Sequence, residues 1–146
     1  MQLVISDAHI LDDDLDTERL GIELAAVTPL GGTWLLHGEL GSGKTTVTRG
    51  IVAGLGGDPY DVSSPTYALA HRYKCNTGWI HHLDLYRLGD GEVWLLGLED
   101  MVSPRDYLIV EWPTDFGPWA NKWVADLTLN VIGDRRFASW TYKSSD

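Results

Sequence analysis

The pattern of apolar and polar residues in the first third of the chain predicts two strands and two helices in alternation. Leu3 to Ile5 is a short apolar run typical of a strand. Apolar residues then recur at helical spacing up to about Val27, and Asp16 or Thr17 is expected to cap this helix. Thr33 to Leu36 follows two glycines and is expected to be a buried strand.

A glycine-rich loop comes directly after this second strand. The helix expected behind the loop ends near Leu55, because Gly56-Gly57 and Pro59 do not continue a helix. The first part of the chain therefore has the order strand, loop and helix.

The second half of the chain predicts mainly strands. Tyr67 to Tyr73 alternates as a half-exposed strand does, and Asn76-Thr77-Gly78 is typical of a hairpin turn into Trp79 to Leu83. Further along, the pattern favours a short helix and three more strands, the last after a turn at Gly133-Asp134: Glu92 to Leu96, Tyr107 to Val110, Ala125 to Ile132 and Phe137 to Tyr142. The sum is an α/β protein, a sheet flanked by helices with antiparallel strand additions.

Length and composition narrow the class of protein. The 146 residues fit a single domain over 1–146, and 44% hydrophobic with 22% charged residues is ordinary for a globular protein. No apolar run approaches the roughly 18 residues of a membrane span, and no basic leader precedes residue 10. With Cys75 as the lone cysteine, the cytoplasm is the expected location.

The net charge of −10 makes nucleic acid an unfavourable direct partner. Seven acids and only Arg19 as a base lie between Asp7 and Glu23. Because clustered Lys and Arg normally supply affinity for phosphates, we expect no direct binding of DNA and contact with RNA only through a partner.

The segment Gly38-Glu39-Leu40-Gly41-Ser42-Gly43-Lys44-Thr45 fits the phosphate-loop pattern G-x-x-x-x-G-K-[ST]. Its three glycines allow backbone N–H groups to surround phosphate oxygens, Lys44 supplies a mobile positive charge, and the Thr45 hydroxyl suits Mg²⁺. Glu39 and Ser42 occupy variable positions and have no assigned side-chain role, although Ser42 belongs to the loop expected to bind the nucleotide. Phosphate binding by this loop is the firmest prediction from the sequence.

Two acids follow apolar runs and are candidates for the metal and the catalytic water. Asp84 follows Trp79 to Leu83, and Glu111 follows Tyr107 to Val110. Both are expected at the C-terminal edge of the sheet, where ligands bind in such folds. Which of the two lies closer to the metal stays open.

Thr66 lies between the phosphate-loop helix and the next strand. Pro65 forces Ser64 into an extended conformation, and a nucleotide-sensing loop often occupies this position in the chain. Thr66 is therefore a candidate for contact with the metal or the γ-phosphate, with an ordinary loop as the alternative.

Four further residues are expected to be structural. His81 and His82 lie within an apolar run and should point to opposite faces of a strand as packed core residues. Arg135 and Arg136, in a turn before an edge strand, are expected to be solvated.

The order of motifs resembles the TsaE (YjeE) family of bacterial tRNA threonylcarbamoyladenosine synthesis. The matching stretches are Gly38 to Thr46, Ser64-Pro65-Thr66-Tyr67, Asp84-Leu85-Tyr86-Arg87-Leu88, Leu96-Gly97-Leu98 and Val110-Glu111-Trp112-Pro113, with Thr17 to Gly21 ahead of them. The resemblance implies ATP and Mg²⁺ as cofactors, with Thr17 and Thr46 beside the nucleotide. It also implies roles for Lys44, Thr66, Asp84 and Glu111 in hydrolysis. Arg135 and Arg136 fall near the C-terminal arginine of the family, so a position near the nucleotide is the alternative to a solvated one for either residue.

The resemblance further implies an ATPase that serves partners resembling the TsaB and TsaD pair, with tRNA reached only through that assembly. A small-molecule or nucleoside kinase is the alternative. The 102 residues after Lys44, with few arginines, leave little room for the substrate pocket and arginine-rich lid that such a kinase needs.

Overall fold

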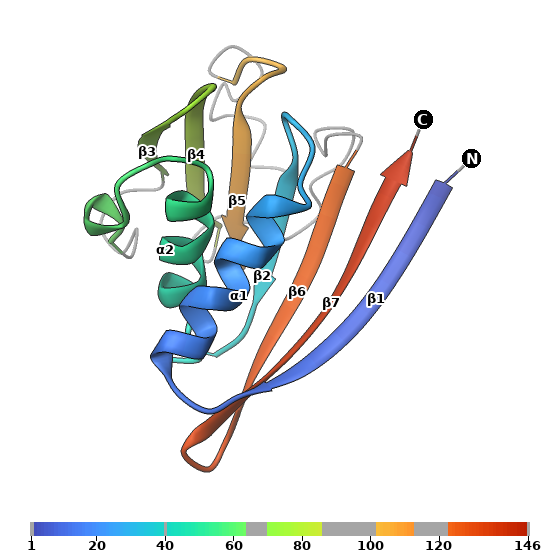
Figure 1. Ribbon diagram of the computed structural model, residues 1–146, viewed down its shortest axis with the longest axis vertical. Coiled ribbons are helices and arrows are strands. Elements are labelled where there is room, and N and C mark those ends of the chain that lie inside the picture. The colour runs from blue at the N-terminus through green and yellow to red at the C-terminus, as the bar shows by residue number, and fades with distance from the viewer. Residues whose placement is uncertain (1, 40, 64–69, 86–101, 113–122, 146) are drawn as a thin grey trace.

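The computed structural model describes residues 2–39, 41–63, 70–85, 102–112 and 123–145 (Figure 1). Within these residues the strands are β1 (Gln2–Leu11), β2 (Thr33–His37), β3 (Ala70–Cys75), β4 (Gly78–Asp84), β5 (Tyr107–Glu111), β6 (Trp123–Ile132) and β7 (Arg135–Ser145). The helices are α1 (Asp14–Ala26) and α2 (Lys44–Gly54), with a short 3-10 turn η1 (Pro59–Asp61).

All these strands belong to one mixed sheet in the order β1-β7-β6-β2-β5-β4-β3. Its centre is parallel, since β2 pairs in parallel with both β5 and β6, and β5 with β4. Antiparallel strands extend the sheet on both sides, β3 beyond β4 on one and β7 and β1 beyond β6 on the other. The predicted α/β class with antiparallel additions is confirmed.

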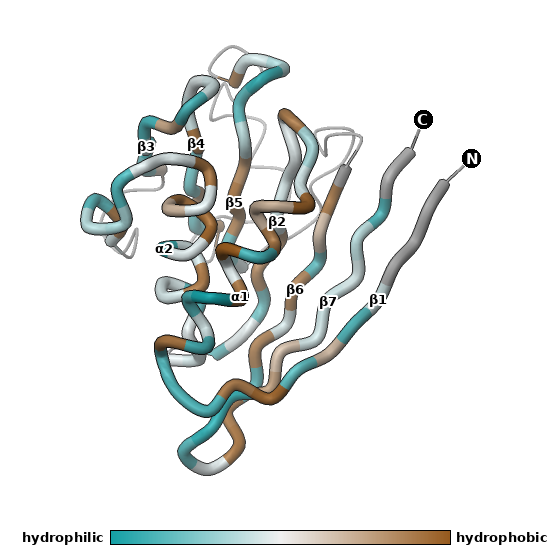
Figure 2. The backbone as a smooth tube through the Cα atoms, in the orientation of Figure 1, coloured by the Kyte–Doolittle hydropathy of each residue, from teal (hydrophilic) through white to brown (hydrophobic). Residues whose placement is uncertain are grey.

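Helices α1 and α2 lie side by side on one face of the sheet (Figure 1). The main core fills the space beneath them and includes fully buried side chains from β2, β5 and α2, namely Trp34, Leu36, Ile51 and Ile109. The hydropathy colouring shows apolar positions along the central strands (Figure 2). A smaller cluster on the opposite face contains Leu83, Leu85, Leu108 and Val110.

Two glycines let α1 and α2 approach closely. A Cβ atom added to Gly50 of α2 would lie 2.0 Å from the carbonyl oxygen of Glu18 in α1. A Cβ atom on Gly21 would lie 2.2 Å from the carbonyl oxygen of Val47. Because these neighbours are backbone atoms, they cannot rotate away, and glycine fixes the distance between the two helices.

Two boundaries differ from the sequence prediction. The cap of α1 is Asp13 rather than Asp16 or Thr17, because the Asp13 carboxylate accepts the amide of Asp16 at 2.9 Å. The first strand was expected over Leu3 to Ile5 only, but β1 pairs with β7 from Gln2 to Leu11. Its polar residues are compatible with a strand because β1 is at the edge of the sheet.

Other predicted elements are confirmed, including β2, α2, β5 and the turn between β3 and β4. The alternation predicted from Tyr67 is borne out for the part of β3 that begins at Ala70. Thr66, Arg87 and the helix expected at Glu92 to Leu96 lie outside the described residues.

Candidate functional site

The glycine loop leaves the C-terminal end of β2 and leads directly into α2, as the sequence predicts. Gly38, Gly41 and Gly43 all have positive φ values, of 154°, 78° and 107°. These conformations suit glycine, and in phosphate loops such conformations let backbone N–H groups face a bound anion. The backbone therefore has the shape that a phosphate group requires, at the N-terminus of a helix where anions are favoured.

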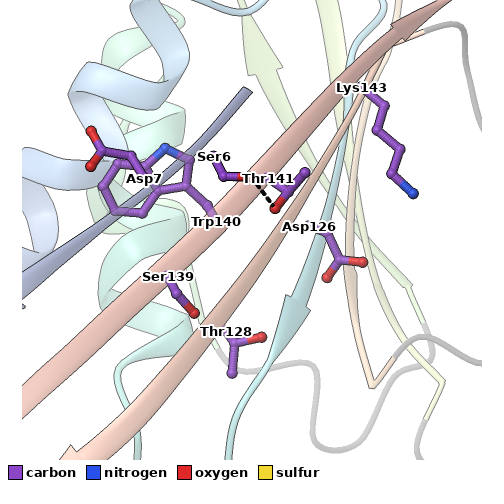
Figure 3. A pocket seen from close by; sticks show the side chains of 8 residues that line it. All are labelled: Ser6, Asp7, Asp126, Thr128, Ser139, Trp140, Thr141 and Lys143. Carbon is purple, nitrogen blue, oxygen red and sulfur yellow. Dashed lines mark hydrogen bonds between the residues drawn. The ribbon is translucent and has the colours of Figure 1, made fainter. Parts of the chain in front are cut away.

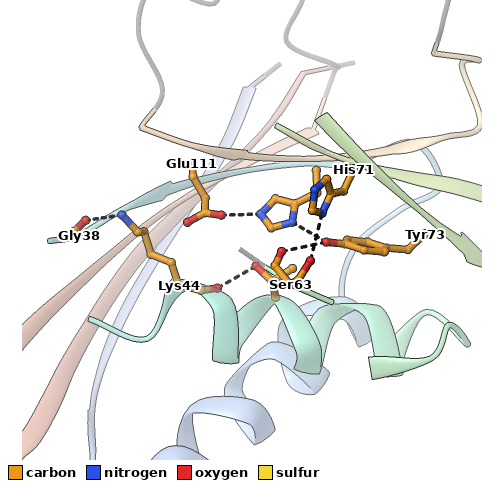
Figure 4. Close-up of polar contacts among 8 residues, drawn as sticks. Gly38, Lys44, Ser63, His71, Tyr73 and Glu111 are labelled. Carbon is orange, nitrogen blue, oxygen red and sulfur yellow. Dashed lines mark hydrogen bonds and ion pairs between the residues drawn. The ribbon is translucent and has the colours of Figure 1, made fainter. Parts of the chain in front are cut away.

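Lys44, the first residue of α2, points back across this loop (Figure 4). Its Nζ donates to the carbonyl oxygen of Gly38 at 2.6 Å, and the residue is only 6% exposed. Burial lowers the pKa of Lys44, an effect that the negative charges of Glu111, Asp84 and Glu39 oppose. A confined positive charge thus lies within the concave surface of the loop.

The two predicted acids end neighbouring strands on the helix-covered face. Strand β5, which ends at Glu111, lies directly beside β2, while β4, which ends at Asp84, is one strand further away. Asp84 and Glu111 are paired in register. Glu111 is buried and Asp84 is half-buried, so the structure brings Lys44, Glu111 and Asp84 together at one edge of the sheet.

Trp112 follows Glu111 with an unusual backbone conformation. Its φ of 53° is the only positive value of a non-glycine residue in the described part of the chain. Its amide donates to the Leu36 carbonyl at 3.3 Å, and its indole ring lies over Lys44, with 3.9 Å from Nζ to the ring centroid. The left-handed turn at Trp112 therefore places an aromatic face on the lysine.

His82 of β4 joins Glu111 to Tyr73 of β3. Its Nε2 lies 2.6 Å from Oε2 of Glu111, and its Nδ1 lies 2.9 Å from the Tyr73 hydroxyl. Figure 4 draws these contacts beside Lys44. Burial raises the pKa of Tyr73 to about 12, although a hydrogen bond with the backbone of Ser63 acts in the opposite direction. The Tyr73 hydroxyl therefore keeps its proton at neutral pH.

The threonines predicted for the site lie in the first turns of the two helices. Thr45 and Thr46 follow Lys44 in α2, and both are half-buried. Thr17 of α1 is buried, and its hydroxyl donates to the Asp13 carbonyl at 3.2 Å. A Cβ atom on Gly43 would lie 3.4 Å from the Thr17 methyl group, so Thr17 packs directly beneath the loop.

The turn between β6 and β7 also contacts the loop. Arg136 donates from Nη2 to the carbonyl oxygen of Gly41 at 3.1 Å. Arg135 forms an exposed ion pair with Asp12, with 3.2 Å between Nε and Oδ1. Arg135 is exposed, as expected of a solvated arginine, whereas the guanidinium group of Arg136 contacts the phosphate loop.

Sequence reasoning missed the roles of His82 and Trp112 in this arrangement. The two histidines do point to opposite faces as predicted, since His81 contacts Asp106 and His82 contacts Glu111. A signal for His82 was present in the sequence. In a strand, residues two apart share a face, and His82 stands two positions before Asp84.

A polar cavity of about 400 Å³ lies over β1, β6 and β7, away from the loop (Figure 3). Its lining includes Ser6 and Thr141, whose hydroxyl groups contact each other at 2.9 Å. Asp126, also in the lining, is paired with His37. None of the residues that the sequence predicts for the site lines this cavity, so it is not the candidate site.

Within the described ranges, no group of three or more His, Cys, Asp or Glu side chains is placed to hold a metal ion. Mg²⁺ commonly takes only one or two carboxylates and completes its shell with water and phosphate oxygens. Thr45, Asp84 and Glu111 fit that pattern of ligands. No helix in the described part of the chain is long and apolar enough to cross a membrane.

A parallel strand, a glycine loop and a helix, with acids at the ends of the neighbouring strands, define a protein of the P-loop NTPase class. The chain belongs to the TsaE family. Residues 11–137 match the family described as threonylcarbamoyl adenosine biosynthesis protein TsaE.

Relatives named tRNA threonylcarbamoyladenosine biosynthesis protein TsaE occur in several bacteria. The Rickettsia felis protein is 35% identical over 139 residues, which cover 94% of this chain and 81% of the relative. The Haemophilus influenzae protein is 42% identical over 78 residues, 53% of this chain and 49% of its own length. The Synechocystis protein is 39% identical over 101 residues, 66% of this chain and 64% of its own length. The chain therefore matches about half and just under two thirds of the last two relatives.

The solved structure of Bacillus subtilis YdiB has the same fold. The two structures superpose with a TM-score of 0.70 over 95% of this chain and 86% of the other, at 22% sequence identity.

Proposed function

We propose that this protein binds ATP with Mg²⁺ and hydrolyses it to ADP and phosphate during threonylcarbamoyladenosine modification of tRNA. The observation that carries the proposal is the position of Lys44, between the glycine loop and the buried carboxylate of Glu111. Membership of the TsaE family and the printed names of the relatives support the tRNA pathway. We place the reaction in the cytoplasm.

Different residues bind the phosphates, balance their charge and hold the metal during phosphoryl transfer. The amides of Gly41 and Gly43 bind phosphate oxygens, whereas the Ser42 amide already donates to the Glu39 carbonyl at 3.0 Å. Lys44 balances the negative charge of the phosphates in a buried setting where charge interactions are strong. Thr45 and one or both of Asp84 and Glu111 hold the metal. When bound, Mg²⁺ supplies charge stabilisation to the phosphates.

Glu111 is the better candidate to orient the attacking water. It is buried, it lies on the strand next to β2, and His82 holds one of its two carboxylate oxygens. The other oxygen would accept a hydrogen bond from the attacking water. Asp84, half-buried on the next strand, suits an outer position around the metal.

Thr66 completes the proposed site as a residue that senses the γ-phosphate. The proposed partners are proteins resembling TsaB and TsaD, which reach tRNA while this chain supplies the hydrolysis. The lysine and the acids of the proposed site lie together in the chain without a partner. This is consistent with a slow ATPase whose rate a partner increases.

The test measures ATP hydrolysis by the purified chain with Mg²⁺, alone and with TsaB-like and TsaD-like partners from the same cell. We expect the partners to stimulate turnover. Lys44→Ala and Glu111→Gln should each reduce the stimulated rate at least about 100-fold, because each removes a charge or a base from the reacting centre.

A matched control is Lys74→Ala, since Lys74 is an exposed lysine on the edge strand β3. This variant should keep the wild-type rate. Full turnover in both site variants would refute the assignment of the site, and transfer of phosphate to an added small molecule without partner stimulation would indicate a kinase.

A further inference from the structure

His82 lies at the centre of a buried chain of polar contacts behind the proposed catalytic acid. The residue is 0% exposed, with Glu111 at 2.6 Å on one side of its ring and Tyr73 at 2.9 Å on the other. A buried histidine with a partner on both nitrogens has a defined ring orientation. Neither the phosphate loop nor the sheet requires a polar side chain at this position.

The hydrogen positions follow from the chemistry of the partners. An ionised carboxylate only accepts hydrogen bonds, so Nε2 of His82 carries the hydrogen that is donated to Oε2 of Glu111. The Tyr73 hydroxyl has one hydrogen, which it can donate to Nδ1 at 2.9 Å or to the Ser63 carbonyl at 3.3 Å. The shorter contact is the one with Nδ1. In that arrangement Nδ1 of His82 accepts from Tyr73, and Nε2 donates to Glu111.

We infer that His82 is a positioning residue, which fixes the carboxylate of Glu111 for water activation, and that Tyr73 fixes the tautomer of His82. The inference rests on the function proposed above. With Oε2 held by His82, rotation of the carboxylate is restricted, and Oε1 is the oxygen proposed to orient the water. Such partners of a ligand or base commonly affect activity about 10- to 100-fold when they are removed.

The neighbouring residue His81 provides an internal comparison. His81 also lies buried on β4 and also contacts a buried carboxylate, with 2.9 Å from Nε2 to Oδ2 of Asp106. It points to the opposite face of the sheet, away from Lys44 and Glu111. His81 of β4 thus forms a histidine–carboxylate pair that lies away from the proposed site.

The experiment compares His82→Leu, His82→Gln and the matched control His81→Leu in the assembly with partners. For His82→Leu we expect kcat to fall about 10- to 100-fold while the dissociation constant for ADP with Mg²⁺ changes less than about twofold. His82→Gln should recover part of the rate, because its amide can donate to Glu111. His81→Leu should lower the melting temperature and leave kcat unchanged.

A second measurement needs no nucleotide. Nitrogen-15 NMR of the histidine rings in the free chain should show His82 with its hydrogen on Nε2 and an unprotonated Nδ1. Tyr73→Phe should shift the Nδ1 resonance, because the donor to that nitrogen is lost. A hydrogen on Nδ1 and none on Nε2 would overturn the inference whether or not any variant folds poorly.

The outcomes separate the inference from the proposed function. If Glu111→Gln abolishes turnover and His82→Leu retains it, or if glutamine is no better than leucine, the positioning role is wrong while the ATPase stands. If the wild-type assembly does not hydrolyse ATP, the proposed function fails, and with it the catalytic part of the inference.

Discussion

Two buried carboxylates contact neighbouring histidines of β4, and their surroundings differ. Glu111 faces the phosphate loop, whereas Asp106 lies on the other face and accepts hydrogen bonds from the amides of Trp79 and Ser103 at 3.2 and 3.1 Å. Burial alone would raise the pKa of Asp106. The hydrogen bonds from His81 and from these two amides outweigh burial and hold the pKa below the ordinary value of 3.8.

This lowered pKa predicts how stability depends on pH. A carboxyl group with a lower pKa in the folded than in the unfolded protein stabilises the fold above the unfolded value and loses that effect as the pH falls through the folded value. Asp106→Asn should therefore lower the free energy of unfolding by about 1–3 kcal/mol at pH 7. The difference in this free energy between wild type and variant should become smaller below pH 3.8. Urea unfolding of both proteins at several pH values measures this.

Asp7→Asn is a suitable control, because Asp7 is an exposed acid on the edge strand β1. It should unfold like the wild type at each pH. If the free energies of unfolding of Asp106→Asn and wild type differ by the same amount down to pH 3, the proposed role of the ionised carboxylate is wrong.

Among the elements, the pair α1 and α2 depends on the absence of side chains where the helices meet. Glycine weakens a helix by about 1 kcal/mol relative to alanine, yet Gly21 and Gly50 both lie within helices. The close approach that they permit brings Thr17 of α1 beneath Gly43 of the loop. The helix contact therefore supports the site as well as the core.

Gly50→Ala should destabilise the fold by about 2 kcal/mol or more, even though alanine favours the helix, because the new methyl group meets the Glu18 carbonyl at 2.0 Å. Thermal and urea unfolding measure this decrease in stability. Gly54→Ala in the same helix meets the Cβ atom of Ala25 at 2.7 Å, a smaller overlap than the 2.0 Å at Gly50, so Gly54→Ala should destabilise the protein less. Equal stability of wild type and Gly50→Ala would show that the helices move apart at little cost.

Local pattern predicted the elements better than it predicted their boundaries and contacts. The loop, α2, β2 and β5 follow from glycine spacing and short apolar runs, which depend on neighbouring residues only. The length of β1 depends on β7, more than a hundred residues away, and the contact of Arg136 with Gly41 depends on a hairpin that must fold back on the loop. Contacts between such distant segments cannot be predicted from the pattern of neighbouring residues in a single sequence.

The same limit applies to the site. Lys44 and Thr45 were predicted from a motif, and Glu111 and Asp84 from their positions at strand ends. The order of the strands, which the sequence does not show, places Glu111 next to β2 and Asp84 one strand further. His82 was identifiable by its face, but only strand pairing shows that it contacts Glu111.

At the scale of the whole molecule, the net charge of −10 limits what the chain binds unaided. The charge of nucleic acid and that of the protein have the same sign, so long-range interaction between them is repulsive. This favours a protein partner as the element that contacts tRNA.

The isolated chain should show no measurable binding of tRNA at physiological salt, and filter binding or gel shift at increasing protein concentration tests this. Retention of tRNA should appear only when the TsaB-like and TsaD-like partners are added. Tight binding by the chain alone, with the steep salt dependence of phosphate contacts, would contradict the charge argument.

The order of the strands also has a consequence for how the molecule folds as it is synthesised. The phosphate loop follows strand β2, but the two strands that pair with β2, β5 and β6, come from residues 107–132. Strand β1 pairs with β7, which is synthesised last, at residues 135–145. Pairings between such distant segments close slowly, and an emerging chain exposes its unpaired strands until they arrive. A ribosome-bound chain that stops before β5 therefore has the complete nucleotide-binding motif and still lacks the sheet that shapes it.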